Sequence, residues 1–288
     1  MSDYDETAKL FVPAGHYYSP IPEPAVAGNY ADWLRDIYKP GVDVPGINID
    51  SERMRTFWTE KLAPHAADLT FPDSKQDGKQ YYYENDFFSY GDAATYSLMI
   101  RHLRPNKVVE VGSGFSSACL LDTLAESGQS PELVFIEPYA DRLRQVIGSE
   151  LQSKTTLMEH SVQSVDMAVF EALESGDLLF IDSTHAFKGG SDVTHELLEI
   201  LPRLKPGVIV HFHDIFYPFE YPREWIRGDQ RAWNECHAMR AFLMYNSRFE
   251  IVFFNDYFAQ VGRDLLEADC PVILRNAGAG LYLRVTGI

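Results

Sequence analysis

The chain has 288 residues, which is long enough for one large domain or for one domain with a cap. Its formal net charge of −17 at pH 7 argues against nucleic acid and against an anionic membrane surface as partners, because both would repel it. No run of about 18 apolar residues is present, so we expect no membrane-spanning segment.

The number of cysteines and the composition of residues 1–30 indicate in which cellular compartment the protein is expected. The three cysteines, at positions 119, 236 and 270, match no metal-binding pattern and cannot form an even set of disulfides. Residues 1–30 contain acids, prolines and glycines but no apolar signal core. We therefore expect a reducing, cytoplasmic location, and the sequence leaves open whether the chain forms a homo-oligomer.

The N-terminal region differs in composition from the rest, because residues 1–50 are rich in proline, glycine and aspartate. Prolines at positions 20 and 22 exclude a long helix there. This stretch is either an extended arm on the surface or a lid whose Tyr17 and Tyr18 close over a binding site. We expect residues 1–79 to form an N-terminal cap and residues 80–288 to form the main domain.

Helical spacing of apolar residues predicts two short helices within the cap, over residues 30–38 and 51–63. A third helix is predicted to begin at Gly91-Asp92-Ala93, after the mixed aromatic and polar stretch 81–88. The expected apolar faces of the first two helices are Trp33, Leu34 and Ile37, and Met54, Phe57 and Trp58.

The stretch 108–117 reads as a buried strand, a glycine turn and the start of a helix, which is the opening of a nucleotide-binding βαβ unit. Gly112 and Gly114 would let the backbone approach a ligand, and the helix would direct N–H groups at it. Twenty-three residues after Gly114, Glu137 ends the strand 133–136 and could accept hydrogen bonds from both hydroxyls of a ribose.

The turn lacks the third glycine of the dinucleotide fingerprint, so a pyrophosphate need not be bound. Glu110, at the end of the strand, would repel phosphate but would suit a ligand that carries an ammonium group.

After this turn, strands and helices alternate regularly, which predicts a parallel sheet with helices on both faces. Ligands of such sheets bind at the carboxyl ends of the strands. The predicted elements are strands 133–136, 155–158, 177–182 and 208–213, helices 139–149, 164–175, 190–201 and 232–245, a loop over 215–231, and strands 249–254 and 281–286 as a closing antiparallel pair.

The run Glu110-Val111-Gly112-Ser113-Gly114 followed by Glu137 resembles motif I and the ribose-binding acid of class I S-adenosylmethionine (SAM) dependent methyltransferases. The resemblance covers roughly residues 80–288. It implies a Rossmann-like doubly wound α/β sheet of about seven strands, mostly parallel with one C-terminal antiparallel strand, and SAM as the cofactor.

The start of the helix at Gly91-Asp92-Ala93 also resembles the catechol-type O-methyltransferases, in which this segment holds the amino-acid end of SAM. The resemblance thus implies a set of residues that contact the cofactor. They are Tyr83, Asn85, Ser89, Asp92, Glu110, Gly112, Ser113, Gly114, Ser117, Glu137, Ser161 and Asp182.

Asp182 ends one predicted strand, and His213 and Asp214 end the next, so all three should meet at one rim of the sheet. Carboxylate oxygens and an imidazole nitrogen suit a divalent cation. Metal-assisted O-methyltransferases bind Mg²⁺ at this place, and the cephalosporin hydroxylase group carries an Ile-Asp-x-x-His stretch similar to residues 181–185. His213 departs from the usual oxygen ligand and favours Mn²⁺, Fe²⁺ or Zn²⁺.

Two other interpretations of these residues remain open: a catalytic histidine–aspartate pair without metal, and purely structural roles. His185, His213 and His237 are the candidates for a base that takes the acceptor's proton. Aromatic residues of the following loop would form a wall of the acceptor pocket or a hydrophobic plug. They are Phe216, Tyr217, Phe219 and Trp225.

The expected function is metal-assisted transfer of a methyl group from SAM to a hydroxyl of a small molecule. Two alternatives are a SAM-fold metalloenzyme that uses non-haem iron for oxidation, and a SAM-binding protein without turnover. The sequence does not identify the acceptor, and aromatic residues near the expected pocket are compatible with a phenol, a sugar or a polyketide.

Overall fold

The computed structural model describes residues 10–148 and 155–287. Within this part of the chain, seven strands form one sheet in the order β3-β2-β1-β4-β5-β7-β6. Strands β1 to β5 are parallel, and β7 is antiparallel to both of its neighbours. The strands are β1 Lys107–Val111, β2 Glu132–Ile136, β3 Thr155–Met158, β4 Leu178–Ile181, β5 Ile209–Phe212, β6 Phe249–Phe254 and β7 Leu281–Val285.

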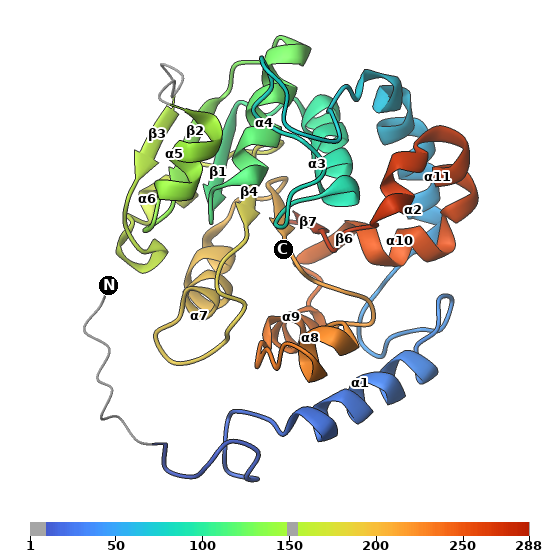
Figure 1. Cartoon of the computed structure of the whole chain (residues 1–288), viewed down its shortest axis with the longest axis vertical. Coiled ribbons are helices and arrows are strands. Elements are labelled where there is room, and N and C mark those ends of the chain that lie inside the picture. Colours follow the sequence, from blue (N-terminus) through green and yellow to red (C-terminus); the bar gives the residue numbers. More distant parts are fainter. Residues whose placement is uncertain (1–9, 149–154, 288) are drawn as a thin grey trace.

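Helices lie around this sheet, as Figure 1 shows, and confirm the Rossmann-like fold class that the sequence predicts. The helices are α1 Pro24–Ile37, α2 Ser51–Phe57, α3 Tyr90–Leu103, α4 Phe115–Ser127, α5 Asp141–Ile147, α6 Ala168–Glu171, α7 Asp192–His195, α8 Arg223–Arg227, α9 Glu235–Leu243, α10 Asn255–Val261 and α11 Arg263–Asp269.

All the predicted strands form at or within one or two residues of their expected bounds. The central strands are buried along their whole length, because helices cover both faces of a parallel sheet. This burial explains why β4 and β5 appear in the sequence as continuous apolar runs rather than as alternating patterns.

The helices predicted over 164–175 and 190–201 differ from the expectation. The helix expected over 164–175 is only α6, because the backbone is extended at Val165 before it. In the turn before β4, the Asp177 carboxylate accepts the N–H of Glu174. The helix expected over 190–201 continues from α7 into a π-helix over Glu196–Ile200, and its wider turn leaves Leu198 exposed. Residue 149, the predicted end of the helix now seen as α5, lies outside the described residues.

Helix α1 begins six residues before the predicted start and buries a different face from the predicted one. Trp33 and Ile37 are exposed, whereas Gly28, Ala31 and Leu34 are buried. The buried face is narrow because α1 packs on α8, where a Cβ at Gly28 would lie 2.1 Å from Nε of Arg227. Figure 1 shows α1 running beside α8.

The segment that contains α2 packs into the core of the sheet. Trp58, at the end of α2, is fully buried, and its ring centroid lies 6.2 Å from that of Phe253 and 5.5 Å from that of Phe258. Its Nε1 donates to Oδ2 of Asp269 at 2.9 Å. Residues around Trp58 therefore share one core with β6 and α10.

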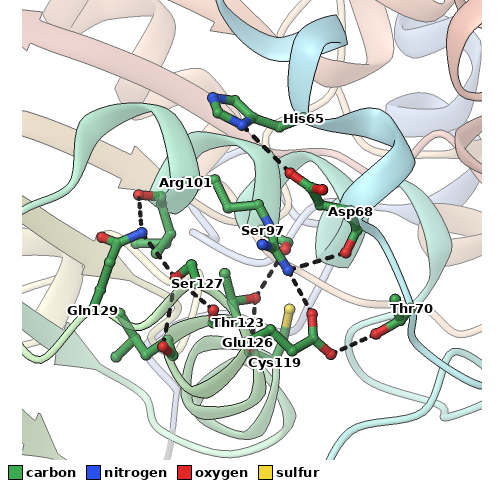
Figure 2. A network of polar contacts seen from close by, with 12 residues as sticks. His65, Asp68, Thr70, Ser97, Arg101, Cys119, Thr123, Glu126, Ser127 and Gln129 are labelled. Atoms are coloured by element: carbon green, nitrogen blue, oxygen red, sulfur yellow. Dashed lines mark hydrogen bonds and ion pairs between the residues drawn. The ribbon is translucent and has the colours of Figure 1, made fainter.

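A second link joins the N-terminal region to α3 and α4. Figure 2 shows the Arg101 side chain of α3 extending between the Asp68 carbonyl and the Glu126 carboxylate of α4. Glu126 also accepts from Thr70 Oγ1 at 2.6 Å and from Lys79 Nζ. Ion pairs and hydrogen bonds of Arg101 and Glu126 thus attach residues 68–79 to helices α3 and α4.

The passage from β1 into α4 depends on Gly112, whose φ is +82°. A Cβ at Gly112 would lie 1.7 Å from the carbonyl oxygen of Asp182, so a side chain is excluded there. Glu110, fully buried beside this turn, accepts from Ser116 Oγ and Ser117 Oγ, each at 2.6 Å. Burial raises the pKa of Glu110 to about 7, although these hydrogen bonds act in the opposite direction.

The three cysteines are buried and form no disulfide with one another. Within residues 10–148 and 155–287, no helix combines the length and the apolar character needed to cross a bilayer.

Replacing Trp58 with alanine should leave a large cavity and should lower the free energy of unfolding by about 3–5 kcal/mol. Trp33→Ala is the matched control, because Trp33 is 52% exposed, and it should change stability by less than about 0.5 kcal/mol. Denaturant unfolding of both variants measures this difference. Equal, small effects would contradict the placement of Trp58 in the common core.

Glu110→Gln should alter how stability depends on pH. The folded pKa of about 7 exceeds the ordinary glutamate pKa of 4.5, so the folded wild-type chain retains a proton that the unfolded chain has lost. Stability of the wild type, relative to Glu110→Gln, should therefore fall by about 3 kcal/mol as the pH rises from about 4.5 to about 7. Urea unfolding across this pH range measures the difference, and parallel stability curves would exclude a buried proton at Glu110.

Candidate functional site

A cavity of about 780 Å³ opens at the carboxyl ends of β1, β2, β4 and β5. It is lined by the turn 112–114 after β1, Glu137 after β2, residues 182–185 after β4, and His213 and Asp214 after β5. This is the edge at which parallel sheets of this kind bind their ligands. A shallower hollow of about 840 Å³, around Arg104 and Thr155, lies at the opposite ends of the strands.

The cavity brings together most of the residues that the sequence singled out. Those that line it are Asn85, Ser89, Asp92, Gly112, Ser113, Gly114, Glu137, Asp182, His185, His213 and Asp214.

Five candidate residues lie elsewhere, and three of these lie well away from the cavity. Tyr83 is buried in an aromatic cluster with Phe71 and Tyr81, and its ring also stacks on that of Tyr90. Ser161 is exposed and bonds only within its own turn, to Ser164. His237 is half-exposed and pairs with Glu220 through Nε2 at 2.8 Å.

Glu110 and Ser117 are the other two, and they lie beneath the glycine turn rather than in the cavity. The Glu110 carboxylate accepts hydrogen bonds from two serines and approaches the Tyr96 hydroxyl at 3.5 Å. Ser117 Oγ also accepts from the N–H of Gly114 at 3.1 Å. These residues therefore hold the turn in place, and the Glu110 carboxylate faces the two serines and is not among the residues that line the cavity.

The side expected to hold the cofactor is built by three segments. Glu137 accepts the Tyr139 N–H through Oε1 at 2.8 Å and directs its carboxyl group to the cavity, where burial raises its pKa. Arg142 on α5 lies over the Phe87 ring, 4.0 Å from its centroid, and both residues line the same wall. The sequence analysis did not identify these two as site residues.

A third wall comes from residues 276–279, which immediately precede β7 and were also missed. The Asp92 carboxylate accepts the N–H of Ala279 at 2.8 Å, and Gly91 donates to the carbonyl of Asn276 at 2.8 Å. A Cβ at Gly91 would lie 2.1 Å from the Ala277 carbonyl oxygen. The run of alanines and glycines over 277–280 was the available signal in the sequence for this close approach of two backbones.

His185 lies at the centre of an acidic cluster. Its Nδ1 lies 2.8 Å from Oε2 of Glu235, and its Nε2 lies 3.4 Å from Asp182 and 3.7 Å from Asp214. Burial lowers the pKa of His185, but hydrogen bonds with Asp182 and Glu235 outweigh burial and raise this pKa well above its ordinary value. Glu235, from α9, was not recognised in the sequence because its helical spacing marked it only as part of a helix.

His213 is the second imidazole of the cluster, and its Nδ1 is buried without a hydrogen-bond partner. Burial lowers its pKa, but the carboxylates of Asp214, Asp182 and Asp92 raise it to about 9. Burial also raises the pKa of Asp92, to about 6. Carboxylates thus outnumber imidazoles here, and the cluster attracts positive charge.

The chemistry of this cluster suits a cation, but its arrangement does not yet form a metal centre. Among the residues that the structure describes, no group of three or more His, Cys, Asp or Glu side chains is placed to hold a metal ion. Asp182, His213 and Asp214 do meet at one rim, as the sequence predicts.

The remaining wall of the cavity is aromatic. Of the four aromatic loop residues predicted to form it, only two line the cavity. Phe216 and Trp225 line the cavity, together with Trp233 and Arg231, whose guanidinium lies 4.1 Å and 4.7 Å from the two tryptophan rings. Tyr217 and Phe219 instead point into the core, where both pack on Phe254.

Tyr17 and Tyr18 are exposed, at 81% and 66%, and are not among the residues that line the cavity. Residues 1–9 of the expected arm lie outside the described residues.

Comparison with known proteins supports this interpretation of the cavity. Residues 109–215 match a family model described as a methyltransferase domain. An uncharacterized protein of Archaeoglobus fulgidus is 32% identical over 173 residues, which cover 59% of this chain and 76% of that protein.

Solved structures with a similar arrangement include two methyltransferases bound to S-adenosylhomocysteine. The methyltransferase of Podospora anserina is 14% identical with a TM-score of 0.42, over 97% of this chain and 100% of that one. The O-methyltransferase of Bacillus cereus is 14% identical with a TM-score of 0.40, over 92% and 100% of the two chains. These values are too low to support a conclusion about substrate.

The family model covers β1 through β5, which are the strands whose ends form the cavity. On this match, residues 109–215 of the chain form a methyltransferase domain, and the glycine turn and Glu137 that line the cavity both lie within it.

Proposed function

We propose that this protein transfers a methyl group from SAM to a hydroxyl of a small molecule, and that a divalent metal assists. The observation that carries the proposal is the single cavity shared by the glycine turn, Glu137 and the acidic cluster around His185. A cofactor held at the first two would place its reactive end beside the third.

The residues of the cavity fit SAM by chemistry and by size. A volume of about 780 Å³ lies within the usual range for ligand pockets of about 300–1,000 Å³. Glu137 can accept hydrogen bonds from ribose hydroxyls, and we assign the amino-acid end of SAM to Asp92, Asn85 and Ser89, which line the same cavity. Bound SAM would supply an electrophilic methyl group on a sulfonium, which leaves as a neutral thioether.

The acceptor side has two tasks, to hold the acceptor and to remove its proton. Trp225, Trp233 and Phe216 supply apolar faces that exclude water from the reacting oxygen. Orientation by these faces makes in-line attack more frequent. The carboxylates at the floor, and the imidazoles once a bound metal has replaced their protons, are the groups that can receive the proton of the hydroxyl.

An excess of carboxylates is the reason to propose a metal here. The surrounding carboxylates raise the pKa of His185 and the pKa of His213, so they favour protons on both imidazoles. A divalent cation held by Asp182, His213 and Asp214 would replace those protons and lower the pKa of an acceptor hydroxyl. Mg²⁺, Mn²⁺ and Fe²⁺ are the candidates, and the imidazole favours the latter two.

The experiment that tests the proposed reaction presents purified protein with methyl-labelled SAM and a panel of phenols, sugars and polyketides. Mass spectrometry should detect an acceptor that has gained one methyl group. Absence of labelled product with every acceptor, together with tight SAM binding, would instead support a SAM-binding protein without turnover.

Glu137→Ala should weaken SAM binding by about 1–3 kcal/mol, because hydrogen bonds from two ribose hydroxyls to a carboxylate are lost. Glu132→Ala is the matched control, since Glu132 lies at the opposite end of the same strand and pairs with Lys107. Titration calorimetry measures both affinities. Unchanged affinity in Glu137→Ala would remove the ribose role from this residue.

Chelation should abolish methyl transfer, and added Mn²⁺, Mg²⁺ or Fe²⁺ should restore it. Asp214→Asn should weaken metal affinity by about 10-fold or more, because a charged ligand becomes neutral, while SAM affinity stays within about 2-fold. Elemental analysis and calorimetry measure the two quantities. Full activity after exhaustive chelation, with no metal detected, would exclude metal assistance and leave His213 and Asp214 as a base pair.

A further inference from the structure

One buried contact beside the cavity remains without a role in the proposed reaction. Glu235 is 1% exposed, does not line the cavity, and reaches His185 Nδ1 at 2.8 Å. We propose that Glu235 is a positioning residue that fixes the ring of His185 with Nε2 facing Asp182 and Asp214. This inference rests on the proposed function, because it assigns His185 a part in methyl transfer.

The segment 233–235 holds the region around His185 at several points. Asn234 and Glu235 both donate backbone N–H groups to the carbonyl of His185, at 3.1 Å and 3.2 Å. The Asn234 side chain accepts from Phe187 N at 2.7 Å and donates to Phe187 O at 3.1 Å. These bonds hold the backbone of His185 at a φ of +57°, a conformation that a non-glycine residue rarely adopts.

The ring itself is restrained from two sides. The Trp233 ring packs on one face of His185, with centroids 4.4 Å apart. At the edge of the ring, the Glu235 carboxylate lies against Nδ1 of His185. Because a carboxylate can only accept a hydrogen bond, Glu235 favours a form of His185 that carries a proton on Nδ1. The other nitrogen, Nε2, is then directed toward the two aspartates that line the cavity.

This arrangement also connects the acceptor wall to the acidic floor. Trp233 lines the cavity on its aromatic side and lies two residues before Glu235. An acceptor that packs against Trp233 would therefore contact the segment 233–235, which also orients His185. Carboxylates that orient a histidine in this way commonly contribute about 10–100-fold to activity.

The chain offers a matched control for this pair. His237 and Glu220 form a second histidine–glutamate contact of the same length, 2.8 Å, with Glu220 buried and neither residue lining the cavity. Glu235→Gln and Glu220→Gln thus make the same chemical change to the same kind of contact, one beside the cavity and one away from it.

Histidine ¹⁵N–¹H NMR tests the contact without any acceptor. The wild type should show a downfield Nδ1–H resonance, assigned to His185 by its absence in His185→Gln. Glu235→Gln should shift or remove this resonance, and Glu220→Gln should leave it unchanged. Persistence of the resonance in Glu235→Gln would overturn the inference.

Kinetics then separate positioning from a general structural role. Glu235→Gln should lower kcat by about 10–100-fold while SAM affinity and melting temperature remain near those of Glu220→Gln. Unchanged kcat, or a parallel loss of melting temperature and SAM affinity, would overturn the positioning role. If the wild type methylates no acceptor, the proposed function fails, and the NMR comparison alone decides whether Glu235 orients His185.

Discussion

The whole site depends on how closely β1 and β4 approach one another at their carboxyl ends. Gly112 lies so near the Asp182 carbonyl that a single methyl group would overlap it. This contact sets the glycine turn, which faces the cofactor side, directly against the segment that begins the acidic cluster. A backbone contact, and not a contact between side chains, therefore sets the position of the glycine turn relative to the acidic cluster.

Around this contact, buried charge is arranged in two layers. Glu110 lies beneath the turn and is bonded by two serines, so its carboxyl group supports the loop instead of facing a ligand. Above it, Asp92, Asp182 and Asp214 surround two imidazoles and raise the pKa of His213. Desolvated carboxylates repel one another, so this upper layer is stable only with protons or another cation among them.

Much of this arrangement follows from local patterns. The strand ends after β1, β2, β4 and β5 could be read from apolar runs followed by glycine or polar residues, which is why Gly112, Glu137, Asp182 and His213 were placed correctly. Tyr83 lies in the core and not in the cavity lining, because an aromatic residue next to a polar stretch has the same local pattern in a core as in a pocket. His237 pairs with Glu220 and does not line the cavity, because helical spacing does not reveal which way a helix is rotated.

The sequence by itself determined the order of strands and helices, the glycine turn, and the edge of the sheet at which polar residues gather, because each of these depends on neighbours within a few residues. Only the tertiary structure decided which side chains meet across long separations. Glu235 reaches His185 over 50 positions, and Ala279 reaches Asp92 over 187. Such pairings depend on how α9 and the loop before β7 pack against the sheet, and no short-range pattern encodes that packing.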